Sequence, residues 1–256
     1  MTFSLRDCEL NKLNSLTKYP SIPTYHALGE KGSLLADTIS FAGDIILTEK
    51  VDGTNSRIIL LPDGNFVLGS REELLFAKGD LIGNPAMGIA DALKDLADSL
   101  PCSPSQIQVI YLELYGGKIT AASKQYTSQQ SISWRLFDIG IIENTAPLFS
   151  QSLAEISAWR EHGGQSFLDE EQLAQAAENY GLTLTPRIAT INSLPSDIQE
   201  TYKFLKQWLP KTQVAIDEGA GGKAEGIVAR TVSRSAIAKL RFEDYERHHK
   251  RTNKPL

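Results

Sequence analysis

Residues 49–55 read Glu-Lys-Val-Asp-Gly-Thr-Asn and follow an Ile-Ile-Leu run at positions 45–47. The apolar run predicts a buried strand over residues 45–49, and Gly53 then breaks the extended pattern. Lys50 is therefore expected near the end of a buried strand. The reference pKa of lysine is about 10.4, and burial or neighbouring positive charge lowers it and frees the amine to act as a nucleophile. For these few residues alone, the alternative is an ordinary lysine in a turn.

The composition is that of a folded protein without a strong overall field. The net charge is -5 and 22% of the residues are charged, so contacts with phosphate groups must come from local clusters of cations. The two cysteines form no CxxC pair, and the four histidines have no zinc-binding spacing. No apolar run approaches the ~20 residues that span a bilayer, and residues 1–10 do not resemble a signal peptide. We expect a cytoplasmic protein with no membrane partner.

Periodicity and turn residues predict strands and helices in mixed order. Strands are expected at 45–49, 56–61, 66–70, 108–115, 133–139, 226–230 and 237–242. A helix over 86–100 ends at Pro101, and three more helices begin at the N-cap residues Ser152, Asp169 and Ser196, each with Glu or Gln three residues later. The glycines of 218–222 predict a mobile loop. This order, with its hairpins, favours an α+β fold over a doubly wound parallel sheet.

Charged and aromatic residues on several of these strands are candidates for chemistry. Lys239 and Arg241 alternate along one strand, so both side chains face the same side. Glu113 lies within a strand and Glu225 enters one, and two such carboxylates suit a divalent metal ion; the alternative is a pair of ordinary solvent-facing glutamates. Phe137 lies in mid-strand, either as a core residue or as a platform for a purine base.

The order of six short motifs resembles that of the covalent nucleotidyltransferase superfamily, which comprises ATP-dependent DNA and RNA ligases and mRNA capping enzymes. The motifs are Lys50-Val-Asp-Gly53, Ser70-Arg71, Glu113-Leu-Tyr-Gly116, Leu136-Phe-Asp-Ile139, Glu225-Gly-Ile-Val228 and Lys239-Leu-Arg241. The sequence is most similar to the RNA-ligase branch, which includes a phage ligase that seals nicked RNA and the trypanosome editing ligases. Asn55 supports this branch, because DNA ligases and capping enzymes usually have arginine there.

The resemblance implies a fold and an activity. Residues 1–242 would form a ligase-type adenylyltransferase domain of mainly antiparallel sheets flanked by helices, with the ATP site between the sheets. The implied enzyme is an ATP-dependent RNA ligase that uses Mg²⁺ or Mn²⁺. It would join the 3′-hydroxyl and 5′-phosphate ends of nicked or single-stranded RNA.

The resemblance also implies a role for individual residues. Lys50 would attack the α-phosphate of ATP and carry AMP, with Lys239 and Arg241 contacting that phosphate. Glu113 would hold the ribose, Phe137 would stack on adenine, and Glu225, with Glu113, would bind the metal ion. Arg71 would contact the nucleotide or the RNA 5′-phosphate. The nucleotide site as a whole is predicted to consist of Glu49, Lys50, Asp52, Gly53, Asn55, Arg71, Glu113, Phe137, Glu225, Lys239 and Arg241.

Two departures from the family pattern affect these expectations. Arg241 stands where the family usually has lysine, but arginine stays charged and can grip phosphate in a bidentate way. The last motif is followed by only a short basic tail, residues 243–256, where DNA ligases and capping enzymes have an OB domain. We expect this tail to be a frayed terminus or a basic arm that contacts the RNA backbone. A partner protein that supplies the missing domain is a further expectation.

Two alternatives are left open by the sequence. One is the same covalent chemistry on nicked DNA, or as a capping guanylyltransferase. The other is a non-catalytic module that binds RNA or a nucleotide on the same scaffold. The oligomeric state is not indicated.

Overall fold

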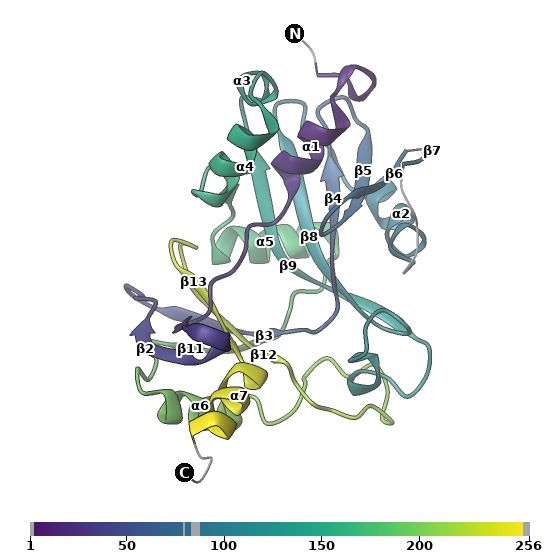
Figure 1. The fold of residues 1–256 in the computed structure, drawn as a ribbon. Helices are drawn as coiled ribbons and strands as arrows, with labels where there is room; N and C mark the ends of the chain where they lie inside the picture. The colour runs from purple at the N-terminus through teal and green to yellow at the C-terminus, as the bar shows by residue number, and fades with distance from the viewer. Residues whose placement is uncertain (1–2, 79, 83–87, 253–256) are drawn as a thin grey trace.

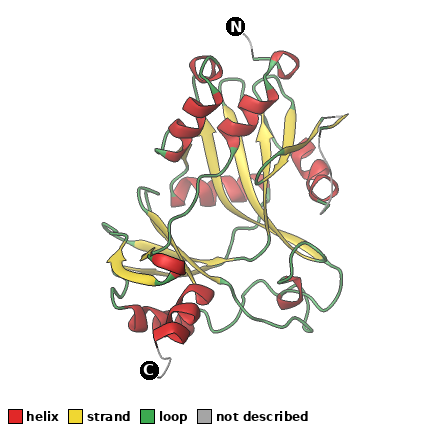
Figure 2. Ribbon diagram, in the orientation of Figure 1, coloured by secondary structure: helices red, strands yellow, loops and turns green. Residues whose placement is uncertain are grey.

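The computed structural model describes residues 3–78, 80–82 and 88–252, and it confirms the predicted α+β class. Figures 1 and 2 show a larger and a smaller main sheet with helices packed against them, and a third sheet consists of two short strands. The helices are α1 (Leu10–Thr17), α2 (Ile89–Ser99), α3 (Thr145–Phe149), α4 (Leu153–Glu161), α5 (Glu170–Tyr180), α6 (Ile198–Trp208) and α7 (Phe242–Thr252). The strands are β1 (His26–Leu28), β2 (Leu34–Thr38), β3 (Ile45–Lys50), β4 (Thr54–Leu60), β5 (Phe66–Ser70), β6 (Leu74–Ala77), β7 (Asp80–Leu81), β8 (Ile107–Gly116), β9 (Ile132–Ile142), β10 (Ser166–Phe167), β11 (Arg187–Ile191), β12 (Gly226–Thr231) and β13 (Ile237–Arg241).

The larger sheet is antiparallel and has the strand order β10-β9-β8-β4-β5-β6-β7. Helices cover both of its faces, which explains why its strands read as nearly continuous apolar runs. In β4, Ile58 and Leu60 pack on the side of α2 and α5, whereas Ile59 packs on the side of α1, α3 and α4. This alternation follows from the two-residue period of a strand. The long strands β8 and β9 extend beyond the helices toward the smaller sheet (Figure 1).

The smaller sheet is also antiparallel, with the order β11-β3-β12-β13. Its outer face buries Ile45 and Leu47 of β3 against α6 and α7. Successive residues of a strand point to opposite faces, so Thr48 and Lys50 of β3 point to the inner face, toward the larger sheet. The chain between α1 and β1 runs along β13, where the Lys239 backbone N–H donates to the Pro23 carbonyl at 2.9 Å.

Charged side chains join the two sheets through a set of ion pairs that we call the junction network. Asp138 of β9 is fully buried and accepts hydrogen bonds from the Tyr19 hydroxyl at 2.8 Å and from Arg234 Nε at 2.9 Å. Glu170 of α5 accepts one from Arg187 Nε at 2.7 Å and another from Arg230. The network consists of Asp138, Glu170, Arg187, Arg230 and Arg234. It fixes β9 and α5 to the smaller sheet.

Helix starts mostly follow the sequence signals, with one correction. Ser152 and Asp169 form the predicted capping boxes of α4 and α5. The N-cap of α6 is Asp197 and not Ser196, because the Asp197 carboxylate accepts from two backbone N–H groups and its charge suits a helix N-terminus. The predicted helix 86–100 appears as α2, and its residues 86–87 lie outside the described part of the chain.

Over its described residues the basic tail is a packed helix and not a frayed terminus, and its contact with the RNA backbone stays a prediction. Residues 242–252 form α7, which buries Phe242, Asp244 and Tyr245 against the smaller sheet, and Lys254 lies outside the described residues. The glycine-rich stretch 218–222 also differs from the expected mobile loop, since Gly221 and Gly222 donate backbone hydrogen bonds to residues 124 and 125. Among the described helices, none is long and apolar enough to cross a membrane.

Candidate functional site

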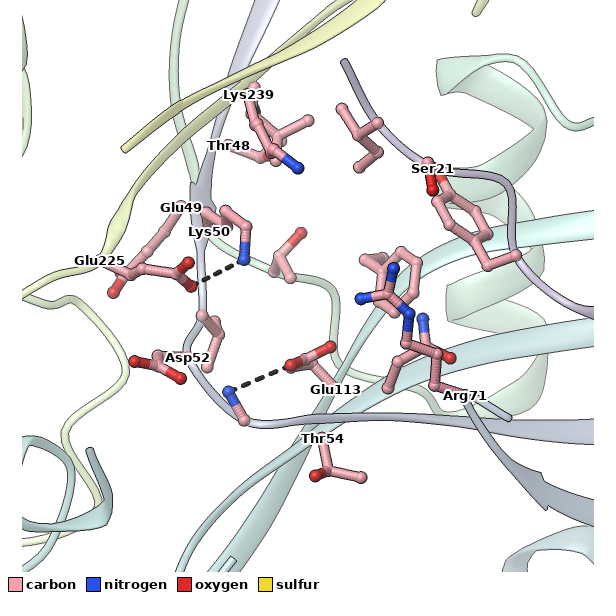
Figure 3. A pocket seen from close by; sticks show the side chains of 18 of the residues that line it. Ser21, Thr48, Glu49, Lys50, Asp52, Thr54, Arg71, Glu113, Glu225 and Lys239 are labelled. Carbon is pink, nitrogen blue, oxygen red and sulfur yellow. Dashed lines mark hydrogen bonds and ion pairs between the residues drawn. The ribbon is translucent and has the colours of Figure 1, made fainter. Parts of the chain in front are cut away.

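A cavity of about 580 Å³ lies between the two sheets, and all the residues predicted for the nucleotide site line it (Figure 3). The smaller sheet contributes the inner faces of β3, β12 and β13, and the larger sheet contributes β4, β8 and β9. The predicted residues in its lining are Glu49, Lys50, Asp52, Gly53, Asn55, Arg71, Glu113, Phe137, Glu225, Lys239 and Arg241. Predicted residues separated by up to 192 positions in the sequence therefore meet in one space.

Lys50 forms an ion pair with Glu225 in this cavity. The Lys50 Nζ atom donates to Glu225 Oε2 at 2.7 Å, and the two side chains are 26% and 18% exposed. The pairing of β3 with β12 explains the contact, because Lys50 lies opposite Gly226, the residue after Glu225. The sequence pointed to cations as neighbours of the amine, and the structure gives it a carboxylate as its hydrogen-bonded partner.

Glu113 of β8 reaches the turn that follows Lys50. Its Oε1 accepts a hydrogen bond from the Gly53 backbone N–H at 3.0 Å. A Cβ atom at position 53 would lie 2.0 Å from the Leu114 carbonyl oxygen, so this close approach requires glycine. Burial raises the pKa of the Glu113 carboxyl to about 8, against the attraction of Lys50 and with the repulsion of Glu225 added. Burial also raises the pKa of Glu225, although Lys50 opposes it.

Lys239 and Arg241 both line the cavity from β13, as their alternation predicted. The pKa of Lys239 is lowered, first by burial and then by the charges of Arg241 and Lys50. Arg241 already has a bidentate partner. Its Nε and Nη2 atoms each donate to the buried carboxylate of Asp244 at 2.8 Å, so the fork predicted for phosphate is engaged by α7.

The apolar part of the lining comes from opposite walls. Phe137 of β9 stands on the larger sheet, and Val228 of β12 on the smaller. The Tyr19 ring packs edge-on against Phe137, with ring centroids 5.0 Å apart. A flat apolar group could lie between these walls.

Three predicted residues occupy less expected positions. The Glu49 carboxylate is buried on the far side of β3, where the Gln213 backbone N–H donates to it at 2.7 Å and the Thr212 hydroxyl also donates. Only the backbone of Glu49 is left to contact a ligand in the cavity. The side-chain oxygen of Asn55 is buried without a hydrogen-bond partner. Arg71 is 67% exposed at the rim, beside Glu72.

The sequence did not single out several residues that line the cavity. They are Tyr19, Ser21, Ile22, Thr48, Thr185, Val228 and Arg230. Thr48 could have been found from the two-residue period, since it precedes Lys50 by two residues on the same strand face. Val228 lies opposite Thr48 and Lys239 on the neighbouring strands, so its place depends on strand pairing. No local signal marks residues 19–22, which are held at the site by the pairing of residues 23–25 with β13 and by the hydrogen bond from Tyr19 to Asp138.

The sequence model of the RNA ligase family matches residues 43–242, which contain all six motifs. The chain belongs to the RNA ligase family. Solved structures agree with this assignment at the level of the fold. The apo form of a Naegleria gruberi RNA ligase variant has a TM-score of 0.53 at 11% identity, with 92% of this chain and 62% of that one covered. A variant of a Naegleria gruberi RNA ligase with ATP and Mn has a TM-score of 0.52 at 13% identity, with 92% of this chain and 63% of that one covered.

An archaeal ATP-dependent RNA ligase gives a TM-score of 0.50 at 18% identity, with 91% of this chain and 50% of that one covered. This member of the RNA ligase family therefore spans about half to just under two thirds of the length of these solved enzymes. At such identities the likeness establishes the fold. A search of curated proteins finds no match.

Proposed function

We propose that this RNA ligase family member is an ATP-dependent RNA ligase that works through a lysyl-AMP intermediate on Lys50. One observation carries the proposal: Lys50, Glu225, Glu113, Lys239 and Arg241 converge on one cavity between the sheets. We call these five residues the cavity cluster. A cavity of this volume is in the range of small-molecule sites, and it combines a nucleophile, cations and apolar walls.

In the first step, Lys50 Nζ attacks the α-phosphorus of ATP. A P–N bond forms, the P–O bond to the β-phosphate breaks, and pyrophosphate leaves. The ammonium must lose a proton before it attacks, and Glu225 Oε2, 2.7 Å from Nζ, is an acceptor within reach. Lys239 and Arg241 supply positive charge where the phosphate oxygens gain negative charge. Asp244 would hold the Arg241 guanidinium in a fixed orientation during this step.

The nucleoside would occupy the apolar end of the cavity. Adenine would lie between Phe137 and Val228, which stand on opposite walls. The Glu113 carboxyl would hold the ribose, and it is already fixed by the Gly53 backbone N–H. Arg71 at the rim would meet the phosphates or the 5′-phosphate of the RNA end, because its exposure allows it to turn toward an incoming strand.

A divalent metal ion, Mg²⁺ or Mn²⁺, fits the same cavity. Two carboxylates, Glu113 and Glu225, face it with pKa values raised by burial and by proximity to a second carboxylate, and a cation would relieve that repulsion. The described residues contain no group of three or more metal-ligating side chains, so phosphate oxygens and water would complete the coordination. Such an ion supplies charge neutralisation at the phosphates.

Two later steps complete the reaction. The RNA 5′-phosphate oxygen attacks the lysyl-AMP phosphorus, the P–N bond breaks, and Lys50 is regenerated as AMP passes to the RNA end. The RNA 3′-hydroxyl then attacks the 5′-phosphate, forming the phosphodiester bond and releasing AMP. In these steps the RNA end would enter the cavity, and the rest of the RNA would lie outside it, where a partner protein or a further domain would supply contacts.

The first test is covalent labelling. The protein is incubated with ATP labelled at the α-phosphate and with Mg²⁺, and then separated on a denaturing gel. We expect a labelled protein band that disappears in Lys50→Ala and persists in Lys78→Ala, an exposed lysine paired with Asp98. No band in the wild type, or an equal band in Lys50→Ala, would exclude this mechanism.

A ligation panel then separates the substrate classes. Nicked duplex RNA, single-stranded RNA and nicked DNA are supplied with ATP, and labelling is repeated with GTP. We expect joining of RNA ends and labelling by ATP. Joining of DNA alone, or labelling by GTP alone, would replace the proposed substrate, whereas ATP binding in calorimetry without labelling would indicate a binding module.

A further inference from the structure

The turn that carries Lys50 is supported from behind by a small core of its own. Val51 packs there with Tyr115, Tyr126 and Val214, and this cluster is separate from the larger cores of the two sheets. Val51 also lines the cavity, whereas Tyr115, Tyr126 and Val214 do not. Tyr126 is fully buried and its ring packs edge-on against Tyr115, with centroids 5.0 Å apart.

Two successive backbone amides of this turn are held by side chains from different elements. The Asp52 N–H donates to the Tyr126 hydroxyl at 2.7 Å, and the Gly53 N–H donates to Glu113 Oε1 at 3.0 Å. Each amide has one donor hydrogen, so these two contacts fix the orientation of both peptide planes. These peptides join Val51 to Asp52 and Asp52 to Gly53, so the chain is held from one residue beyond Lys50.

The segment that carries Tyr126 is itself fixed. Ile216 donates a backbone hydrogen bond to the Tyr126 carbonyl at 2.7 Å, and Gly222 donates to the carbonyl of Gln125 at 3.0 Å. Asp217 accepts hydrogen bonds from Thr127 and from the backbone N–H of Ser128. Residues 116–131 and 209–222 thus form a wall of two interlocked loops behind the turn.

The same wall holds β3 one residue before Lys50. The buried carboxylate of Glu49 accepts hydrogen bonds from the Thr212 hydroxyl and the Gln213 backbone N–H. Lys50 therefore lies between two anchors, Glu49 before it and Asp52 after it, and both attach to the loops. Burial raises the pKa of the Tyr126 phenol, further increased by Asp52 and Glu49, so its hydroxyl stays protonated in the working range.

We propose that Tyr126 is a positioning residue for adenylyl transfer to Lys50, acting through the Asp52 amide. This inference rests on the proposed function. Tyr126 touches neither nucleotide nor reacting atoms; its hydroxyl holds the turn so that Nζ points along the line of attack on the α-phosphorus. A misplacement of about 1 Å at a reacting group can cost roughly 10²-fold in rate, so a turn that loses one anchor should lose rate before it loses affinity.

The variant Tyr126→Phe isolates the hydroxyl. Phenylalanine keeps the ring packing on Tyr115 and Val51 but leaves the Asp52 N–H without its acceptor. We expect the single-turnover rate of lysyl-AMP formation at saturating ATP to fall about tenfold, with the ATP concentration for half-maximal rate changed less than about twofold. A residue that mattered only for stability would lower the melting temperature and leave the rate of the folded protein unchanged.

Tyr245→Phe is the matched control. Tyr245 is also buried, and its hydroxyl is 2.8 Å from His26 Nδ1, but it lies on the outer side of the smaller sheet. We expect this variant to keep the wild-type rate. Amide hydrogen exchange provides an independent measurement: the Asp52 amide should lose protection in Tyr126→Phe and keep it in Tyr245→Phe.

The outcomes distinguish the two claims. Wild-type protein that is not labelled removes the proposed function and this inference with it. Wild-type protein that is labelled, with Tyr126→Phe reacting at the same rate, overturns this inference alone. A change confined to the half-maximal ATP concentration would also overturn it, because it would place Tyr126 in nucleotide binding.

Discussion

The junction network and the cavity cluster lie between the same two sheets but neutralise their charges differently. In the junction network, Glu170 accepts hydrogen bonds from Arg187 and Arg230. Burial raises the pKa of the Glu170 carboxyl, but these two arginines together lower it by more, so the net shift is downward. In the cavity cluster, Glu225 has Lys50 as its ion-pair partner, and its pKa stays raised by burial. Both side chains are 18% exposed, and Glu170 has two cationic ion-pair partners where Glu225 has one.

This difference in partners distinguishes charged groups that join the sheets from charged groups that are available to a ligand. Transferring a charged group from water to the protein interior costs free energy. A complete set of hydrogen-bond and ion-pair partners offsets this cost, and an incomplete set does not. Perturbed groups that line a cavity are therefore candidates for function, whereas perturbed groups with full sets of partners are structural. Three substitutions test this division, two of them on cations that belong to the two clusters.

Lys239→Met should give the largest effect, and it should fall on the reaction. The variant removes a cation that would meet the developing charge on the α-phosphate, and we expect lysyl-AMP formation to slow about 10³-fold, equivalent to about 4 kcal/mol. The free energy of unfolding should hold or rise slightly, because the pKa of Lys239 is lowered by burial and by Arg241 and Lys50. Labelling rates and urea denaturation measure the two quantities. A large decrease in the free energy of unfolding would instead show that Lys239 stabilises the fold in the way that the junction network does.

Arg230→Met should have its main effect on the free energy of unfolding and not on the reaction. Arg230 is 2% exposed and contacts Glu170 and Asp138, so its loss leaves buried carboxylates without one cation. Breaking a buried pair on one side costs about 3 kcal/mol or more, and we expect a loss of that size in urea denaturation. Arg71→Met is the control, since Arg71 is 67% exposed and should change stability by less than about 0.5 kcal/mol. A loss below about 1 kcal/mol in Arg230→Met would show that the network does not hold the sheets together.

The two clusters also differ in how far the sequence could predict them. Lys50, Glu113, Glu225 and Lys239 each carry a local motif, and strand alternation places Lys50, Glu113 and Lys239, whereas Glu225 directly precedes β12. The α+β class and the main strands follow from the same periodicity. Asp138 and Glu170 carry no local signal that pairs them with Arg230, because their contacts span 92 and 60 positions and depend on how the sheets meet. Tyr126 is hidden for the same reason, 74 positions from the amide that it holds.

Asp244 lies on the border between the two kinds of charge, and it was also missed. Asp244 lies three residues after Arg241, in the acidic first turn of α7, whereas the sequence pattern of this segment is dominated by the basic residues that follow. Its carboxylate is 1% exposed and binds both Arg241 and Arg247. Arg241 thus lines the cavity while being paired in the manner of the junction network.

Asp244→Asn should therefore give a smaller, mixed effect. The amide keeps the shape of the side chain but removes the charge that orients the Arg241 guanidinium. We expect lysyl-AMP formation to slow about tenfold, or about 1.4 kcal/mol, with a loss of stability of similar size. Glu243→Gln is the matched control, because Glu243 is exposed and, within the described residues, forms its ion pair with Arg247. If the Asp244→Asn rate matches the control while stability falls, Arg241 acts in the fold and the bidentate pair has no part in catalysis.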